Sequence, residues 1–230
     1  MSNRSEYDAI IGDDTIVEPD VIVGFKYHPD CGPAKIGANG ILRRGTIVYG
    51  DVQLGDFFQT GHNVIIRAKV RAADYCTVCN QSTLEGVIRM GTGVRIMSHV
   101  YVPTRTWFGD QVFVGPGVNF LNSRYPGRVP DVPTPRGATI EDQVMIGGGC
   151  TIMAGITIGR RSFIAAGAVV VCDVPERSFV KGCPGVVQPL PPQLDVEMDR
   201  NLTLQPLDLW HPKTPLATVD WPDDWPERWA

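Results

Sequence analysis

Large apolar residues recur at every sixth position along most of this chain. Steps of six from Ile36 reach such residues as far as Phe120, with Thr60 and Ala72 as the exceptions. An α-helix repeats every 3.6 residues and a strand every two, so neither element alone produces this period. The same period occurs earlier, at Ile10, Ile16 and Ile22, and resumes two residues out of phase at Ile140.

A second column, four residues after the first, holds small or β-branched residues such as Val64, Cys76, Ser82 and Val100. A period of six arises when short strands alternate with tight turns and three such units close a triangular coil of about 18 residues, which is stabilised by stacking on its neighbours. We therefore predict an all-β fold, a left-handed parallel β-helix of hexapeptide repeats with about seven coils. Glycine often follows the large aliphatic residue, and we expect it there because glycine tolerates the positive φ of a tight corner. The examples are Gly37, Gly55, Gly61, Gly91, Gly109, Gly115, Gly147 and Gly159.

Two segments interrupt the repeat, at 24–35 and at 121–139, and the second is a long loop rich in proline and arginine. Long loops in a compact repeat domain are usually functional or disordered. After about Val187 the period ends, so we predict a β-helix domain at 1–187 and an irregular tail at 188–230. The tail contains Trp210, Trp221, Trp225 and Trp229. We expect it to pack against the flank or base of the β-helix, with recognition of a partner as the alternative.

Charge and composition exclude several classes of protein. The net charge is −4 and no long basic run occurs, so nucleic-acid binding is not expected. No stretch of about 18 apolar residues is present, which predicts no membrane span. The first residues contain no long apolar run, so we expect no signal peptide and a cytoplasmic protein. The six scattered cysteines agree with a reducing compartment.

The repeats resemble the hexapeptide-repeat acyltransferase superfamily over about residues 10–187. The segment GATIEDQVMIGGGCTIMAGITIGRRSFIAAGAVVVCDVPERSFVKGCPG (137–185) is similar to the CoA-binding end of that superfamily. NQSTLEGV (80–87) and FVGPGVNFLNSRYPGR (113–128) are similar to the branch that N-acetylates nucleotide-linked 3-amino sugars for surface polysaccharides. The resemblance implies acetyl-CoA as co-substrate, a nucleotide-linked amino sugar as acceptor, and a homotrimer whose sites lie between subunits.

The resemblance also implies that CoA lies along residues 140–185. Small side chains there would let the extended pantetheine arm approach the backbone. The chain departs from the superfamily at Val171 and Cys172, where a Thr-Lys pair is frequent, and at Val186, where an arginine is frequent. Other basic residues would then have to bind the CoA phosphates. The expected cofactor contacts are Gly148, Ala154, Arg160, Arg161, Ala166, Gly167 and Lys181.

Polar residues repeat at the length of one coil and should therefore stack on neighbouring coils. One row is His62, Asn80 and Ser98, and the adjacent row is Asn63, Gln81 and His99. Acyl transfer needs a base for the proton of the nucleophile and donors for the tetrahedral oxyanion. Either histidine could be the base. The asparagines, Gln81 or a backbone N–H could supply the donors, and Asn63 and Gln81 are also candidate substrate-binding residues. A hydrogen-bonded polar ladder at a subunit seam is the alternative.

Two further pairs follow from the same spacing. Arg67 and Glu85 should form an ion pair across coils, and Glu85 could also bind a hydroxyl or amine of the sugar. Arg71 and Arg89 should stack as like charges beside Trp107. A stacked arginine pair is costly alone, so we expect either the phosphates of the nucleotide-linked substrate or acidic residues of a neighbouring subunit nearby.

Three other functions remain open. An O-acetyltransferase of the sugar and antibiotic type carries Gly-His-Pro in the extended loop, where this chain has Asn122-Ser123-Arg124. Asn122 is instead a candidate substrate-binding residue. A γ-type carbonic anhydrase binds zinc with three histidines, two of them five residues apart; only His62 and His99 lie on the coils, so no metal site is expected. A non-catalytic β-helix scaffold is the third alternative.

Overall fold

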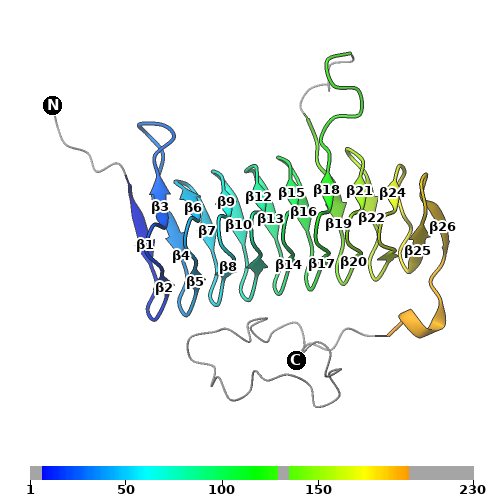
Figure 1. The fold of residues 1–230 in the computed structure, drawn as a ribbon, viewed down its shortest axis with the longest axis horizontal. Helices are drawn as coiled ribbons and strands as arrows, with labels where there is room; N and C mark the ends of the chain where they lie inside the picture. Colours follow the sequence, from blue (N-terminus) through cyan, green and yellow to red (C-terminus); the bar gives the residue numbers. More distant parts are fainter. Residues whose placement is uncertain (1–6, 129–134, 197–230) are drawn as a thin grey trace, which may run out of the picture.

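The computed structural model describes residues 7–128 and 135–196, and in these ranges three parallel sheets run along one axis (Figure 1). Sheet 1 contains β1 (Ala9–Ile11), β4 (Ala34–Ile36), β7 (Gln53–Leu54), β10 (Val70–Ala72), β13 (Ile88–Met90), β16 (Trp107–Phe108), β19 (Thr139–Ile140) and β22 (Thr157–Ile158). Sheet 2 contains β2 (Ile16–Val17), β5 (Ile41–Leu42), β8 (Gln59–Thr60), β11 (Thr77–Val78), β14 (Arg95–Ile96), β17 (Phe113–Val114), β20 (Met145–Ile146), β23 (Phe163–Ile164), β25 (Ser178–Lys181) and β26 (Val186–Pro189). Sheet 3 contains β3 (Ile22–Phe25), β6 (Ile47–Tyr49), β9 (Ile65–Ile66), β12 (Thr83–Leu84), β15 (Tyr101–Val102), β18 (Asn119–Phe120), β21 (Thr151–Ile152) and β24 (Val169–Val170).

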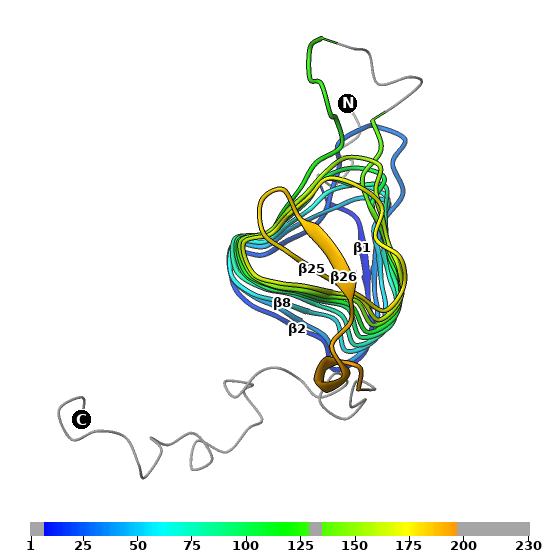
Figure 2. The ribbon, with the colours of Figure 1, turned by 90° about the vertical axis from the view of Figure 1, so that its right-hand side faces the viewer.

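Successive strands pass from one sheet to the next, so each coil gives one strand to every sheet. Eight such coils lie in the described ranges, one more than the sequence count of about seven. Viewed along the axis, the coils superpose as a triangle (Figure 2). The predicted β-helix is confirmed. Its corners are named here by the sheets they join: corner A joins sheet 1 to sheet 2, corner B joins sheet 2 to sheet 3, and corner C joins sheet 3 to sheet 1.

Both apolar columns point into the triangle. Ile66, Val78 and Leu84 of the first column and Val64 and Cys76 of the second are fully buried. The fold therefore follows from burial: each short strand places one large side chain in a shared core, and stacked coils cover one another. At the C-terminal end, β25 and β26 form an antiparallel pair that extends sheet 2 beyond β23.

The glycine column has a different cause from the one expected. Gly61 and its equivalents have no positive φ; in that corner the positive φ falls two residues later, at Asn63 (φ 56°). A Cβ atom on Gly61 would lie 2.4 Å from the backbone N of Asn80 on the next coil. The same close approach occurs at all eight glycines of the column, with the nearest atoms at 2.2 to 2.5 Å. Coil-to-coil contact, and not backbone conformation, therefore requires glycine there.

The two predicted excursions leave the helix at corner C, and Figure 1 shows them on the same side. The first runs between β3 and β4, and the second between β18 and β19. Arg124 anchors the start of the second loop, because its guanidinium donates to the backbone oxygens of Ala154 and Val171, each at 3.3 Å. Both long irregular segments therefore lie next to sheet 1.

Beyond β26 the chain continues into the 3-10 helix η1 (Pro192–Leu194). Asp195 then pairs with Arg161 at 3.2 Å and with Arg177, so this segment is held against the last coils. Within the described ranges η1 is too short to cross a bilayer. The boundary predicted at 187/188 remains a prediction, and Trp210, Trp221, Trp225 and Trp229 lie outside the described residues.

Candidate functional site

Corner B contains the two predicted polar rows, and backbone hydrogen bonds confirm that they stack. Gln81 N donates to His62 O and His99 N donates to Asn80 O, each at 2.9 Å. A cavity of about 410 Å³ opens beside this corner over sheet 2, and His62, Asn80 and Ser98 line it. Asn63, Gln81 and His99 do not line that cavity; they occupy the exposed row with positive φ. The structure therefore separates the two rows.

Asn80 makes a hydrogen bond that fixes the orientation of its amide. Its Oδ1 accepts the backbone N–H of His62 at 2.7 Å. Only the carbonyl oxygen of the amide can accept a hydrogen bond, so Nδ2 is the end left to donate to a ligand. Asn80 can therefore offer a donor to a developing oxyanion in the cavity that His62 also lines.

Corner A shows the same hydrogen bond with aspartates. Asp74 Oδ1 accepts the N–H of Asp56, and Asp110 Oδ1 accepts the N–H of Thr92, both at 2.8 Å. Asp56 and Asp142 make equivalent bonds. Asn80 therefore has a structural role in addition to any catalytic one, and it differs from the corner A residues in having an amide N–H₂ group.

Arg43 and Cys79 also line this cavity and were not singled out from the sequence. Cys79 directly precedes Asn80, and Arg43 lies two coil lengths before Cys79. The same spacing of 18 residues, counted from Cys79, would therefore have identified Arg43. Burial raises the pKa of the Cys79 thiol, although Arg43 and Arg95 oppose the shift. The thiol is therefore protonated at neutral pH and is a poor nucleophile. Arg43, whose Nη1 donates to Thr60 O at 2.8 Å, brings positive charge to the cavity.

The same corner continues toward the C-terminal end with small residues. Gly149 N donates to Pro116 O at 2.8 Å, and Gly167 N donates to Gly148 O at 2.9 Å. No other atom lies within 4 Å of a Cβ built on Gly149 or Gly167, so the backbone there is open. We call this stretch the corner B track; it comprises Pro116, Gly117, Gly148, Gly149, Ala166 and Gly167.

The predicted cofactor residues fall on three different corners. Gly148, Ala166 and Gly167 lie on the track, and Lys181 lies beside its end because β25 follows β23 in register. Arg160 and Arg161 lie at corner A, where Asp195 pairs with Arg161. Ala154 lies at corner C beneath Arg124. The structure therefore brings together four of the seven residues.

The predicted substrate residues also divide. Asn63 and Gln81 lie in the exposed row of corner B, and the other four lie elsewhere. Glu85 lies at corner C, where it pairs with Arg67 at 2.5 Å as expected. Asn122 lies at the base of the second loop, where its backbone oxygen accepts from Arg136. Arg71 and Arg89 pair in register on sheet 1 beside Trp107. Within one chain, sheet 3 separates all four from corner B. No cluster of three or more potential metal ligands occurs among the described residues.

Comparison with known proteins supports the fold and the type of repeat. The family model for the bacterial transferase hexapeptide (six repeats) matches residues 137–172. A Saccharomyces cerevisiae protein that carries an acetyltransferase name is 40% identical over 77 residues, covering 32% of this chain and 39% of that protein. The bifunctional protein GlmU of Heliobacterium modesticaldum is 26% identical over 180 residues, which is 76% of this chain and 31% of GlmU. The chain thus spans about a third of the length of these relatives.

Among solved structures, the UDP-N-acetylglucosamine acyltransferase LpxA of Bacteroides fragilis superposes with a TM-score of 0.59 at 15% identity. The match covers 82% of this chain and 74% of LpxA, and at that identity it bears on the fold alone. Together with the hexapeptide match, it agrees with the left-handed coils. The chain is therefore a left-handed parallel β-helix built from hexapeptide repeats, and its resemblance to the hexapeptide-repeat acyltransferases is confirmed.

Proposed function

We propose that this protein transfers an acetyl group from acetyl-CoA to the amino group of a nucleotide-linked amino sugar. The observation that carries the proposal is the continuity of corner B. A cavity lined by a histidine and an oriented amide leads, on the same edge of the helix, into a track of small residues with open backbone. Reacting groups and a path for an extended thioester are thus adjacent. The segments 80–87 and 113–128 support the amino-sugar acceptor through their resemblance to that branch of enzymes.

The proposed reaction forms a C–N bond and breaks a C–S bond. The neutral amine attacks the thioester carbonyl, and Asn80 Nδ2 donates to the oxyanion that develops. His62 takes the proton that the nitrogen loses, and the proton then passes to the departing CoA thiolate. The products are the amide and free CoA, so no other reactant is required.

The residues of the track fit the pantetheine arm of CoA. Nothing covers the outer side of Gly149 and Gly167, so an extended ligand could lie against the backbone there, and Lys181 places one positive charge at the end of the track. Acetyl-CoA would supply the activated acyl group, while the track would orient its thioester toward the cavity.

Replacing Ala166 by tryptophan should abolish acetyl-CoA binding and leave the fold intact. Ala166 is exposed on the track, so the larger side chain would fill the path of the ligand without entering the core. Isothermal titration with acetyl-CoA measures the affinity, and thermal melting checks the fold. A similar exposed change at corner A, Glu176→Trp, is the matched control. If the affinity of Ala166→Trp equals that of the parent, the cofactor binds elsewhere.

The function itself is tested by thiol release. The chain is incubated with acetyl-CoA and a panel of nucleotide-linked amino sugars, and free CoA is measured. An amide product resists mild base and an ester does not, so the same products distinguish N-acetylation from O-acetylation. Absence of both release and saturable acetyl-CoA binding would contradict the proposal and favour the scaffold.

We also expect a homotrimer. The cavity at corner B is open on one side, and four of the residues predicted to bind substrate (Arg71, Glu85, Arg89 and Asn122) lie on other faces of the chain, so a second copy would complete the site. Light scattering should give about three times the 25.2 kDa mass of the chain. A monomer at micromolar concentration would count against a shared site.

A further inference from the structure

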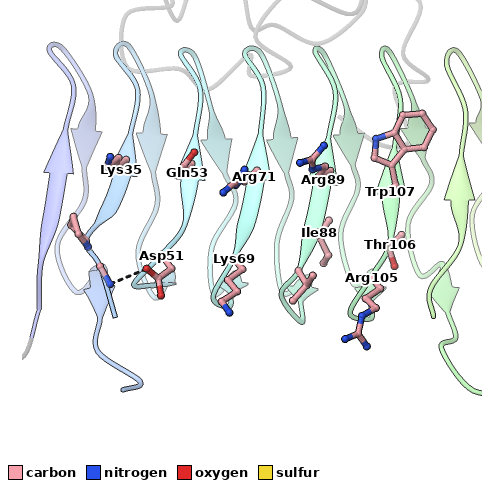
Figure 3. Close-up of a pocket in the computed structure, with 13 residues that line it drawn as sticks. Lys35, Asp51, Gln53, Lys69, Arg71, Ile88, Arg89, Arg105, Thr106 and Trp107 are labelled. Carbon is pink, nitrogen blue, oxygen red and sulfur yellow. Dashed lines mark hydrogen bonds between the residues drawn. The ribbon is translucent and has the colours of Figure 1, made fainter. Parts of the chain in front are cut away.

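A second cavity lies away from corner B, over sheet 1 and corner C. It has a volume of about 830 Å³ and is drawn in Figure 3. One row of its lining residues points outward from sheet 1, namely Lys35, Gln53, Arg71, Arg89 and Trp107, on strands paired in register. A second row lies at corner C and includes Asp51, Lys69, Val87 and Arg105. We call this cavity the sheet 1 groove.

The groove is strongly basic in a protein of net negative charge. Five cationic side chains line it against one carboxylate; they are Lys35, Lys69, Arg71, Arg89 and Arg105. Arg71 and Arg89 are neighbours on adjacent strands, about 4.8 Å apart along the sheet. None of the ion pairs among the described residues involves either arginine. Like charges on directly opposite positions of neighbouring strands repel each other, and an anion bound between them would relieve that repulsion.

The only carboxylate of the groove is already engaged. Asp51 Oδ1 accepts the N–H of Gly32 at 2.8 Å, and Oδ2 accepts the hydroxyl of Tyr27 at 2.6 Å. The second bond raises the pKa of Tyr27 to about 12, because it stabilises the protonated phenol. Asp51 therefore holds the first loop at one end of the groove, and its contacts do not neutralise the arginine pair at the centre.

The other end of the groove presents an aromatic surface. Trp107 is 40% exposed and follows Arg89 in register, and the apolar Val87 is 48% exposed at corner C. A tryptophan one strand away from two arginines suits a ligand with a flat ring joined to closely spaced phosphates. From Lys35 to Trp107 the row spans four strand spacings, or about 19 Å, which is long enough for such a ligand.

From these features we propose that the sheet 1 groove binds the nucleoside diphosphate of the acyl acceptor. Arg71 and Arg89 hold the two phosphates, and Trp107 stacks on the base. The proposal rests on the proposed function for the identity of the ligand as acceptor. Sheet 3 separates the groove from corner B of the same chain, so the attached sugar would reach corner B of a neighbouring copy. CoA also contains a nucleoside diphosphate, and the experiment must therefore separate the two sources.

Isothermal titration of the full chain with UDP, GDP, dTDP and CoA tests the groove without any acyl transfer. We expect at least one of the three nucleoside diphosphates to bind, and to bind more tightly than uridine or inorganic pyrophosphate. The double variant Arg71→Gln/Arg89→Gln should weaken that affinity by at least about 10-fold, because charged hydrogen bonds to phosphate are lost. Trp107→Leu should weaken it by roughly 10-fold.

Arg44→Gln is the matched control. Arg44 is an exposed arginine outside the groove, and it pairs with Asp20 at 3.4 Å. This variant should bind the nucleotide as the parent does. Thermal melting verifies that every variant folds. We expect all of them to fold because the substituted side chains point outward from the core.

Four results of the binding and assembly measurements would overturn the proposal. In the first, the parent chain binds none of the nucleoside diphosphates; in the second, the double arginine variant binds the nucleotide as tightly as the parent. In the third, the double variant loses affinity for CoA and keeps its affinity for the nucleotide; in the fourth, it no longer forms the oligomer but still binds the nucleotide. The last result would assign the arginines to acidic residues of another copy. If a nucleotide binds in the groove but no amino sugar is acetylated, the groove stands and the proposed function fails. If acetylation proceeds unchanged in the double arginine variant, the proposed function stands and the groove assignment fails.

Discussion

The variant His62→Ala should lower kcat by roughly 100-fold, the scale at which a general base contributes. His62 is exposed, and its link to Asn80 uses the backbone N–H, which alanine retains. The melting temperature should therefore change little.

His99 provides the control for this prediction. It lies in the row with positive φ (61°), outside the cavity, so alanine would add backbone strain that asparagine avoids. His99→Asn should therefore keep kcat within a few-fold of the parent. If both variants and their combination remain active, no protein base is used and the corner acts as a substrate clamp. A loss confined to His99→Asn would move the base to the other row.

The variant Asn80→Asp should lower kcat by roughly 100-fold with little loss of stability. Aspartate keeps the oxygen that accepts the N–H of His62, as Asp74 and Asp110 do at corner A. It removes the N–H₂ donor and places a negative charge where the oxyanion develops. Loss of one oxyanion donor typically costs about 100- to 1000-fold in kcat. Steady-state kinetics and a thermal melt of the same preparation measure the two effects.

Two further variants separate structure from chemistry at this position. Asp74→Asn makes the reverse exchange at corner A, away from the cavity, and should leave kcat unchanged. Asn80→Ala removes both the acceptor and the donor, so it should lower the stability by about 1 kcal/mol in addition to its effect on kcat. An Asn80→Asp enzyme as active as the parent would show that Asn80 only joins coils.

The period of six was sufficient to predict the fold, because one large side chain per strand must enter a shared core. The constant length of a coil was sufficient to predict the stacking of His62 on Asn80, and the pairing of Arg67 with Glu85. Both properties depend only on distance along the chain.

The length of a coil also determines on which corner each predicted cofactor residue lies. Ala166 follows Gly148 by a full coil, whereas Ala154 and Arg160 follow it by one third and two thirds of a coil. Those fractions place them at corners C and A, as observed. The prediction treated 140–185 as one surface, whereas the structure distributes these residues over three corners.

Other features depended on the tertiary structure. Spacing shows that Asn80 is near His62 but not which atom of its amide is engaged, because that depends on the local backbone geometry. The cavity formed beside one polar row and not the other, since turn residues with positive φ direct their side chains away from sheet 2. Asp195 follows the repeats, so no period predicts that it meets Arg161. The period of the sequence determines which side chains are buried and which residues stack on neighbouring coils. Side-chain hydrogen bonds and cavities depend instead on exact atomic positions, including those of segments outside the repeat.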